Sequence, residues 1–408
     1  MGRSPKYKLS QDLGPPATQD KRQDSNRASE EDVQQLRRRI AALEEQARRE
    51  REESEGFNAA LASISERPKL AGHATPEGCR QFAAGFGAES VSFYRPAQDI
   101  LISSLGIGTS PGARDHKTDL DYARAIHAAL RGGVNLIDTS LNYRHQRSEC
   151  AAATGLRGFI EDSRGARDAV VVCTKGGYLV PGAYSESALR SSDVEGGIHC
   201  MSPAFLADQI DRSRRNLGLE TIDIYYLHNP EIQLKFIEMT AFMNRVRAAI
   251  DRLERAVSDG LVGYYGMATW DGYRNGALSL RAMVEAARQI AGDSHHFRFV
   301  QLPYNLEMQE ARTCRVHNGG SVLDVAMELG ITVISSRSLA QAHLSRNLPV
   351  TYADTPSALR TDAQRAIQFV RSTPGITSAL VGMRDMAHVV ENLEIARNPP
   401  LTAAVYQP

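Results

Sequence analysis

Beyond residue 100 the chain alternates eight short apolar or β-branched segments with amphipathic stretches, and this repeat constrains the fold more than any other feature. Each apolar segment changes abruptly to polar residues or glycine, as a strand does where it enters a loop before a helix. Eight strand–helix units in line predict an α/β protein with a closed (β/α)8 TIM barrel, because an open doubly wound sheet would carry a GxGxxG fingerprint that is missing here. The expected strands are 102–109, 135–140, 170–177, 222–230, 264–270, 299–306, 332–338 and 378–383.

Helical periodicity fills the intervals between these strands. A chain of 408 residues still fits one barrel with an extension, since barrels of this kind commonly run from about 250 to 400 residues. The segment near 148–161 has a weaker helical pattern than the others. The expected helices are 121–133, 202–219, 242–260, 278–292, 322–330, 357–372 and 387–396.

The N-terminal part differs in composition and predicts an extension outside the barrel. Residues 1–28 are polar and proline-containing, with too few apolar side chains to offset the entropy of ordering, and we expect them to be disordered. Ser29 and Asp32 then form a capping box before an apolar seam that predicts a helical arm over 29–67. Residues 68–97 connect this arm to the barrel at 98–408. The seam consists of Val33, Leu36, Ile40, Leu43 and Ala47, and Phe57, Leu61 and Ile64 are positioned to continue it.

The function of the arm stays open between two readings. Its seam covers only about two heptads, fewer than the three or four that define a coiled coil. One reading is a single helix docked on its own barrel, and the other is a short coiled coil for self-association or for a partner helix. Pro68 ends the arm in both.

Charge and cysteine usage narrow the class of partner. Lys plus Arg and Asp plus Glu each total 48, so no net field attracts nucleic acid or an anionic membrane surface. No segment approaches 18 uninterrupted apolar residues. Five scattered cysteines without a CxxC spacing argue against a disulfide framework and against a zinc site, so we expect no metal and a cytoplasmic location.

The ends of the expected strands carry groups suited to proton transfer. Asp138 ends the second strand with Tyr143 just beyond it, Lys175 ends the third, and His228 ends the fourth. A phenol has a reference pKa of about 10, and a nearby ammonium lowers that pKa by stabilising the phenolate. Lys175 can supply this ammonium with Asp138 as its counter-ion, while His228 can donate a hydrogen bond to a substrate carbonyl. Active sites of barrels lie at these strand ends.

The same segments resemble the aldo-keto reductase family. GGVNLIDTSLNYRHQRSE resembles its signature, CTKGG its lysine strand, IDIYYLHNP its histidine strand, FVQLPYNL its glutamine strand, and TPGITSALVGMRDMAHVVENL its adenosine-phosphate segment. The resemblance covers residues 98–398 and includes bacterial and potassium-channel β-subunit-like members. It implies hydride transfer between NADP(H) and an aldehyde or ketone without a metal. In that scheme Tyr143 is the general acid/base, Lys175 its partner, Asp138 the counter-ion and His228 the carbonyl-orienting group.

The resemblance also implies cofactor contacts. Gln301 matches the residue at the nicotinamide carboxamide, Arg384 lies where the family places a group near the 2′-phosphate, and Glu391 and Asn392 match the adenine pair. Thr109 fits a contact near the nicotinamide ribose. The remaining expected contacts are Thr269, Ser336, Arg337, Ser338, Leu339, Gly382 and His388.

Three departures from the family pattern concern this cofactor side. Ala268 and Thr269 replace the usual Ser-Asn or Ser-Arg, and His388 replaces a common Gln or Arg. Ser336-Arg337-Ser338-Leu339 replaces an aromatic-Ser-Pro-Leu run whose ring stacks on the nicotinamide. They leave NAD(H) open as an alternative cofactor.

Two functions from different classes follow. The leading hypothesis is an NADP(H)-dependent oxidoreductase of a small carbonyl or alcohol substrate, and the alternative is a nucleotide-binding regulatory subunit of the channel β-subunit type. The complete acid–base set favours chemistry, whereas the arm favours regulation. Substrate identity would depend on the loops at 178–201 and 231–240 and on Trp270, which either lines the pocket or packs in the core.

Overall fold

The computed structural model describes residues 55–64, 66–87, 92–162, 165–316, 319–346, 348 and 359–401, together with scattered positions between 34 and 48. Internal contacts divide the chain into two units, Met1–Glu55 and Gly56–Pro408. The described positions of the first unit are helical. The tail at 1–28 and the seam residues Val33, Leu36, Ile40, Leu43 and Ala47 lie outside the described residues.

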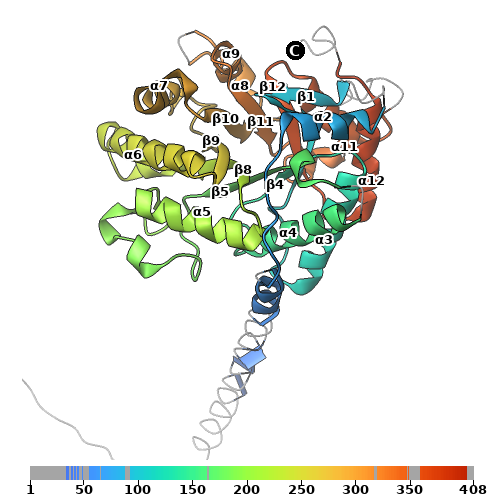
Figure 1. The fold of residues 1–408 in the computed structure, drawn as a ribbon, viewed down its shortest axis with the longest axis horizontal. Helices are drawn as coiled ribbons and strands as arrows, with labels where there is room; N and C mark the ends of the chain where they lie inside the picture. The colour runs from blue at the N-terminus through green and yellow to red at the C-terminus, as the bar shows by residue number, and fades with distance from the viewer. Residues whose placement is uncertain are drawn as a thin grey trace, which may run out of the picture. The chain divides into compact units, whose positions relative to one another are not determined.

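A closed barrel of eight parallel strands forms the second unit, as the sequence predicts (Figure 1). The strands neighbour one another in the order β3, β4, β5, β8, β9, β10, β11, β12, and β12 pairs with β3 to close the ring. Each overlaps one expected segment, although β9, β10 and β12 begin two residues earlier than expected. Their bounds are β3 Leu105–Gly108, β4 Leu136–Asp138, β5 Val171–Gly176, β8 Ile222–His228, β9 Val262–Ala268, β10 Phe297–Pro303, β11 Thr332–Ser336 and β12 Ile376–Gly382.

The first expected strand, 102–109, is divided between two elements in the structure. Residues Ile100–Ser103 form β2, which pairs antiparallel with β1 (Tyr94–Ala97), and the barrel strand β3 begins only at Leu105. The strand is interrupted between them. The Ser103 hydroxyl donates to the Leu105 carbonyl at 2.7 Å, and the Ser103 amide donates to the Asn135 side-chain oxygen. Only Ser103 and Ser104 separate the apolar residues of the two strands, and no glycine or proline marks the break.

The β1–β2 hairpin closes the N-terminal end of the barrel. Ile100 and Ile102 belong to the same buried cluster as the barrel residues Leu136 and Phe299. Helix α2 (Pro76–Ala84) contributes Cys79 to this cluster. The region expected to be only a connection at 68–97 therefore completes the inner core.

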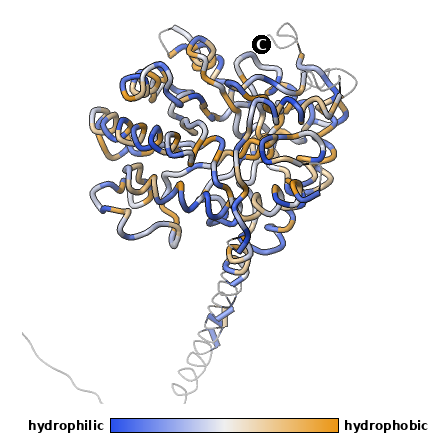
Figure 2. Tube along the Cα trace, viewed as in Figure 1, coloured by the Kyte–Doolittle hydropathy of each residue, from blue (hydrophilic) through white to orange (hydrophobic). Residues whose placement is uncertain are grey.

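Helices surround the barrel, and in Figure 2 they alternate hydrophilic and hydrophobic residues along their length. This pattern is the one expected of helices that bury a single face against strands. The weakly patterned segment near 148–161 is a full helix, α4. The helices that follow the barrel strands are α3 His116–Arg131, α4 Arg147–Glu161, α5 Pro203–Leu217, α6 Met239–Ser258, α7 Leu280–Ala291, α9 Val322–Glu328, α11 Asp362–Ser372 and α12 Met386–Leu393.

The last part of the expected arm packs on the barrel unit. Residues 55–64 are helical, and Phe57, Leu61 and Ile64 form a small apolar cluster with Cys150 and Ala153 of α4. These three side chains therefore contact α4 of the same chain, which is the docked arrangement for this end of the arm.

The hydropathy of the helices and the state of the cysteines can also be compared with the sequence. In the described part of the chain, no helix combines the length and the hydropathy that crossing a bilayer requires. All five cysteines are free thiols, and four of them are buried.

Candidate active site

A cavity of about 580 Å³ opens at the C-terminal ends of the barrel strands. Its walls come from the ends of β3, β4, β8, β9, β10, β11 and β12 and from the loops that follow them. Of the expected acid–base residues, Asp138, Tyr143 and His228 line it. Lys175 lies directly behind, fully buried.

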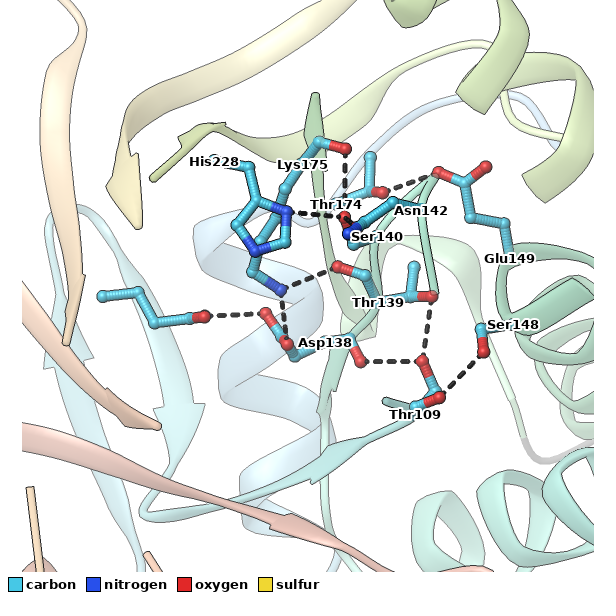
Figure 3. Close-up of polar contacts among 11 residues, drawn as sticks. Thr109, Asp138, Thr139, Ser140, Asn142, Ser148, Glu149, Thr174, Lys175 and His228 are labelled. Carbon is cyan, nitrogen blue, oxygen red and sulfur yellow. Dashed lines mark hydrogen bonds and ion pairs between the residues drawn. The ribbon is translucent and has the colours of Figure 1, made fainter. Parts of the chain in front are cut away.

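Asp138 and Lys175 form a buried ion pair between adjacent strands, β4 and β5 (Figure 3). Lys175 Nζ lies 2.7 Å from Asp138 Oδ2 and also donates to the Thr139 carbonyl at 2.8 Å. The other carboxylate oxygen, Asp138 Oδ1, accepts from Gln301 Nε2 at 2.7 Å. Burial alone would lower the pKa of Lys175, but the pKa is raised, with the Asp138 charge as the largest opposing effect, so the lysine stays an ammonium.

Tyr143 lies over this ammonium. Lys175 Nζ is 4.8 Å from the centroid of the Tyr143 ring. The pKa of the phenol is raised above its ordinary value because burial disfavours the phenolate, and the Lys175 charge opposes that rise. The lysine thus acts in the direction expected from the sequence, although burial is the larger effect. A protonated phenol at neutral pH follows.

His228 faces the same space from the end of β8. Its ring centroid is 5.7 Å from that of Tyr143 and 5.0 Å from that of Tyr178, both in edge-to-face geometry. His228 Nδ1 is 3.1 Å from the Ser140 hydroxyl, as Figure 3 shows. Burial, reinforced by the Lys175 charge, lowers the pKa of His228 well below its ordinary value, so the ring is neutral near pH 7.

The segment after Tyr143 is strained. Arg144, His145 and Gln146 have left-handed φ angles of 49°, 51° and 70°. Left-handed backbone costs residues with a Cβ roughly 1–2 kcal/mol each, so three in a row need compensating contacts. Strain of this kind persists beside functional sites where the surroundings hold it.

The expected cofactor residues fall into two groups. Those at the strand ends line the cavity, but the Thr109 hydroxyl is occupied within the protein, where it contacts Thr139 at 2.9 Å and the Asp138 carbonyl at 3.2 Å. The cavity-lining group is Thr109, Thr269, Gln301, Ser336, Arg337, Ser338, Leu339 and Gly382. The second group is not part of the cavity wall and lies at or beyond the end of β12, namely Arg384, His388, Glu391 and Asn392.

Trp270 lines the cavity and is 38% exposed, so the pocket reading of this residue holds over the packing reading. The Arg337 guanidinium lies 4.7 Å from the centroid of the Trp270 ring. Glu231 fixes the Trp270 loop by accepting from the amides of Trp270 and Asp271. The run after β11 thus has no aromatic residue, but its Arg337 stacks on Trp270 from the loop after β9.

Several residues that the sequence reasoning passed over belong to this site. Thr139 and Ser140 directly follow Asp138 and bond Lys175 and His228, so their adjacency to a strand-end acid was a usable signal. Tyr178 accepts from Asn229 Nδ2 at 2.9 Å while it contacts His228. Glu149 lies behind the site, where it accepts from the Thr174 hydroxyl at 2.6 Å. No spacing in the sequence marks the contacts of Tyr178 or Glu149.

Known proteins are similar in sequence to the barrel region of this chain. The model of the aldo/keto reductase family matches residues 104–407. The 6-dehydroglucose reductase of Novosphingobium aromaticivorans is 27% identical over 307 residues, which cover 72% of this chain and 86% of that protein. The L-glyceraldehyde 3-phosphate reductase of Escherichia coli is 27% identical over 188 residues, 46% of this chain and 45% of that protein.

Solved structures share the fold. An aldo/keto reductase from Klebsiella pneumoniae, crystallised with NADP and acetate, superimposes with a TM-score of 0.55 at 19% identity and covers 77% of this chain and 92% of its own. A glycerol dehydrogenase from Gluconobacter oxydans gives a TM-score of 0.54 at 19% identity, with 77% and 93% covered. With the family model matching most of the chain, the protein belongs to the aldo/keto reductase family.

Proposed function

We propose that this protein is an NADP(H)-dependent oxidoreductase that interconverts a small aldehyde or ketone and its alcohol, with Tyr143 as the general acid/base. The observation that carries the proposal is the single cavity wall shared by Asp138, Tyr143 and His228, with Lys175 bonded directly behind it. Family membership supports the reaction class, and the relatives at 27% identity are both named as reductases.

The proton chemistry follows from the electrostatics of these side chains. A phenol whose pKa is raised by burial stays protonated at neutral pH. It can give its proton to a substrate carbonyl oxygen as negative charge develops there, which forms the alcohol. The Lys175 ammonium stabilises the phenolate left behind. It is held in place by the Asp138 carboxylate and the Thr139 carbonyl.

His228 suits the orientation of a carbonyl. A neutral imidazole has one N–H, and the tautomer that would serve a substrate carbonyl carries this proton on Nε2. The Nε2 proton can then donate to the carbonyl oxygen beside the Tyr143 phenol. A neutral donor also adds no second positive charge beside Lys175.

The polar groups of the cavity fit a nicotinamide dinucleotide. Thr269 Oγ1 and Arg337 Nε belong to residues of the cavity wall, are buried and have no hydrogen-bond partner among the described residues. Buried polar atoms usually have partners, so these two support a polar ligand on this side of the site. The Klebsiella relative was crystallised with NADP. A bound reduced nicotinamide would supply the hydride, and Arg384 would meet the 2′-phosphate.

A substrate screen tests the proposal. Purified protein is mixed with NADPH and a panel of aldehydes, ketones and sugars, and NADPH absorbance is followed against protein-free controls. We expect saturable NADPH consumption with at least one carbonyl compound. Tight NADPH binding without turnover of any of them would instead support the regulatory, nucleotide-binding alternative.

A further inference from the structure

The left-handed segment after Tyr143 is held by an ion cluster. The sequence analysis did not predict this cluster, and the proposed reaction gives it no role. Asp119 of α3 accepts from Arg144 Nη2 at 2.5 Å and from Arg147 Nη1 at 2.6 Å. The side chains of Arg144 and Arg147 are 1% and 4% exposed, and that of Asp119 is 13% exposed. We call these three residues the Asp119 cluster.

The two arginines flank the strained segment. Arg144 is its first residue, and Arg147 is the first residue of α4, directly after Gln146. One carboxylate on α3 therefore fastens both ends of the segment. The Arg144 Nε atom also donates to the Ala113 carbonyl at 2.7 Å, which ties the segment to the loop after β3.

Tyr143 is covalently attached to the start of this segment. A left-handed backbone that is not glycine relaxes toward ordinary conformations when its contacts are removed, and such a change at Arg144 turns the peptide plane that follows Tyr143. We propose that the Asp119 cluster is a positioning device that holds the Tyr143 phenol over Lys175. The proposal rests on the proposed reductase function, in which that phenol is the proton donor.

The N-terminal helical segment reaches the same cluster. The Arg147 guanidinium lies 5.6 Å from the centroid of the Phe57 ring, and Phe57 packs with Cys150 and Ala153 on α4. Phe57 thereby covers a member of the cluster with an aromatic face, a favourable arrangement for a guanidinium. The helix at 55–64 thus contacts the Asp119 cluster through Phe57 and Arg147.

Asp119→Asn tests the device because it keeps the shape of the side chain and removes the charge. Asp121→Asn is the matched control, since Asp121 lies on the same helix in an exposed pair with Lys117. Hydrogen–deuterium exchange gives a readout that needs no substrate or cofactor. We expect faster exchange of the amides at 143–147 in Asp119→Asn and unchanged exchange in β5 around Lys175. The control should match the wild type at both places.

Kinetics with NADPH and 4-nitrobenzaldehyde give the second readout. Misplacing a reacting group by about 1 Å can cost on the order of 10²-fold, so we expect kcat of Asp119→Asn to fall by about tenfold or more. The dissociation constant of NADPH, measured by fluorescence, should change less than kcat, because Asp119 itself lies outside the cavity wall. A loss of kcat no larger than that of Asp121→Asn, or unchanged exchange at 143–147, would overturn the proposal.

A rescue variant separates positioning from general stability. His145 lies in the middle of the strained segment, and glycine adopts its φ of 51° without steric cost. We expect His145→Gly in the Asp119→Asn background to recover several-fold of the lost kcat. No recovery would mean that backbone strain is not what the cluster holds. A wild-type chain that reduces no carbonyl would refute the proposed function, and the exchange data would still decide whether the cluster orders Tyr143.

Discussion

The acid–base side and the cofactor side of the cavity differ in how many of their polar groups have hydrogen-bond partners within the protein. On the acid–base side, Asp138, Lys175 and His228 all contact protein partners within about hydrogen-bond distance. On the cofactor side, Thr269 Oγ1 and Arg337 Nε are buried without partners in the described part of the chain. Preorganised groups accelerate chemistry because they need no rearrangement, whereas unpaired polar groups gain most from a ligand. The difference supports the proposal that one side carries the acid–base chemistry and the other binds the cofactor.

Tyr143→Phe should give the largest effect, and it bears on the acid–base side alone. The change removes the transferable proton and keeps the ring over Lys175, so we expect turnover to fall by about 10²- to 10⁴-fold. NADPH affinity should stay near that of the wild type. Both are measured with one carbonyl substrate in steady-state assays and by fluorescence titration. Wild-type turnover in this variant would mean that another group supplies the proton.

Lys175→Met should reduce turnover to a comparable degree and shift its pH dependence. The lysine charge lowers the pKa of Tyr143 against the effect of burial, so removing that charge raises the pKa further. Alcohol oxidation needs the phenolate, and its pH profile should therefore move to higher pH. Asp138→Asn is the control for loss of the ion pair. A profile that stays in place would make Lys175 a structural residue.

Arg384→Ala tests the binding side. A guanidinium at the 2′-phosphate is worth about 1.5–3 kcal/mol, so the dissociation constant of NADPH should rise by roughly 10- to 150-fold. NADH lacks that phosphate and should bind almost as before. Calorimetric titration with both cofactors makes the comparison. Equal losses for the two would place Arg384 away from the phosphate.

Two truncations should have the smallest effect on the cavity. Removing residues 1–55 leaves the Phe57, Leu61 and Ile64 cluster on α4 intact, and we expect an unchanged melting temperature. Removing residues 1–67 deletes that cluster and should cost about 2–4 kcal/mol of stability from lost apolar burial. Light scattering on the protein that lacks residues 1–55 shows whether these residues control the mass of the oligomer. An unstable 1–55 truncation would contradict the division of the chain.

The barrel could be predicted because its signal is periodic and local. Each strand–helix unit repeats the same change from apolar to polar residues, and this change also locates the strand-end residues Asp138, Lys175 and His228. The β1–β2 hairpin was missed because only two serines, Ser103 and Ser104, separate the apolar residues of β2 from those of β3. Periodicity reports which face is buried and does not report where a buried run breaks.

Contacts between distant loops could not be predicted. Arg337 and Trp270 stack across the ends of β9 and β11, which are not neighbours in the sequence or in the sheet. The left-handed segment at 144–146 contains no glycine, so the usual marker of positive φ was absent. The net pKa of Tyr143 depends on how deeply the phenol is buried, and only the folded structure gives that burial.

The most direct test of the central claim follows the hydride itself. NADPH carrying deuterium at C4 of the nicotinamide, in separate samples of each face, is incubated with the protein and 4-nitrobenzaldehyde, and the alcohol is analysed by mass spectrometry. If the protein transfers hydride as proposed, one deuterated form gives an alcohol with deuterium at the former carbonyl carbon, and Tyr143→Phe lowers the rate of its formation by about 10²-fold or more. An alcohol without deuterium from either form, or equal rates in the two proteins, would contradict the proposal.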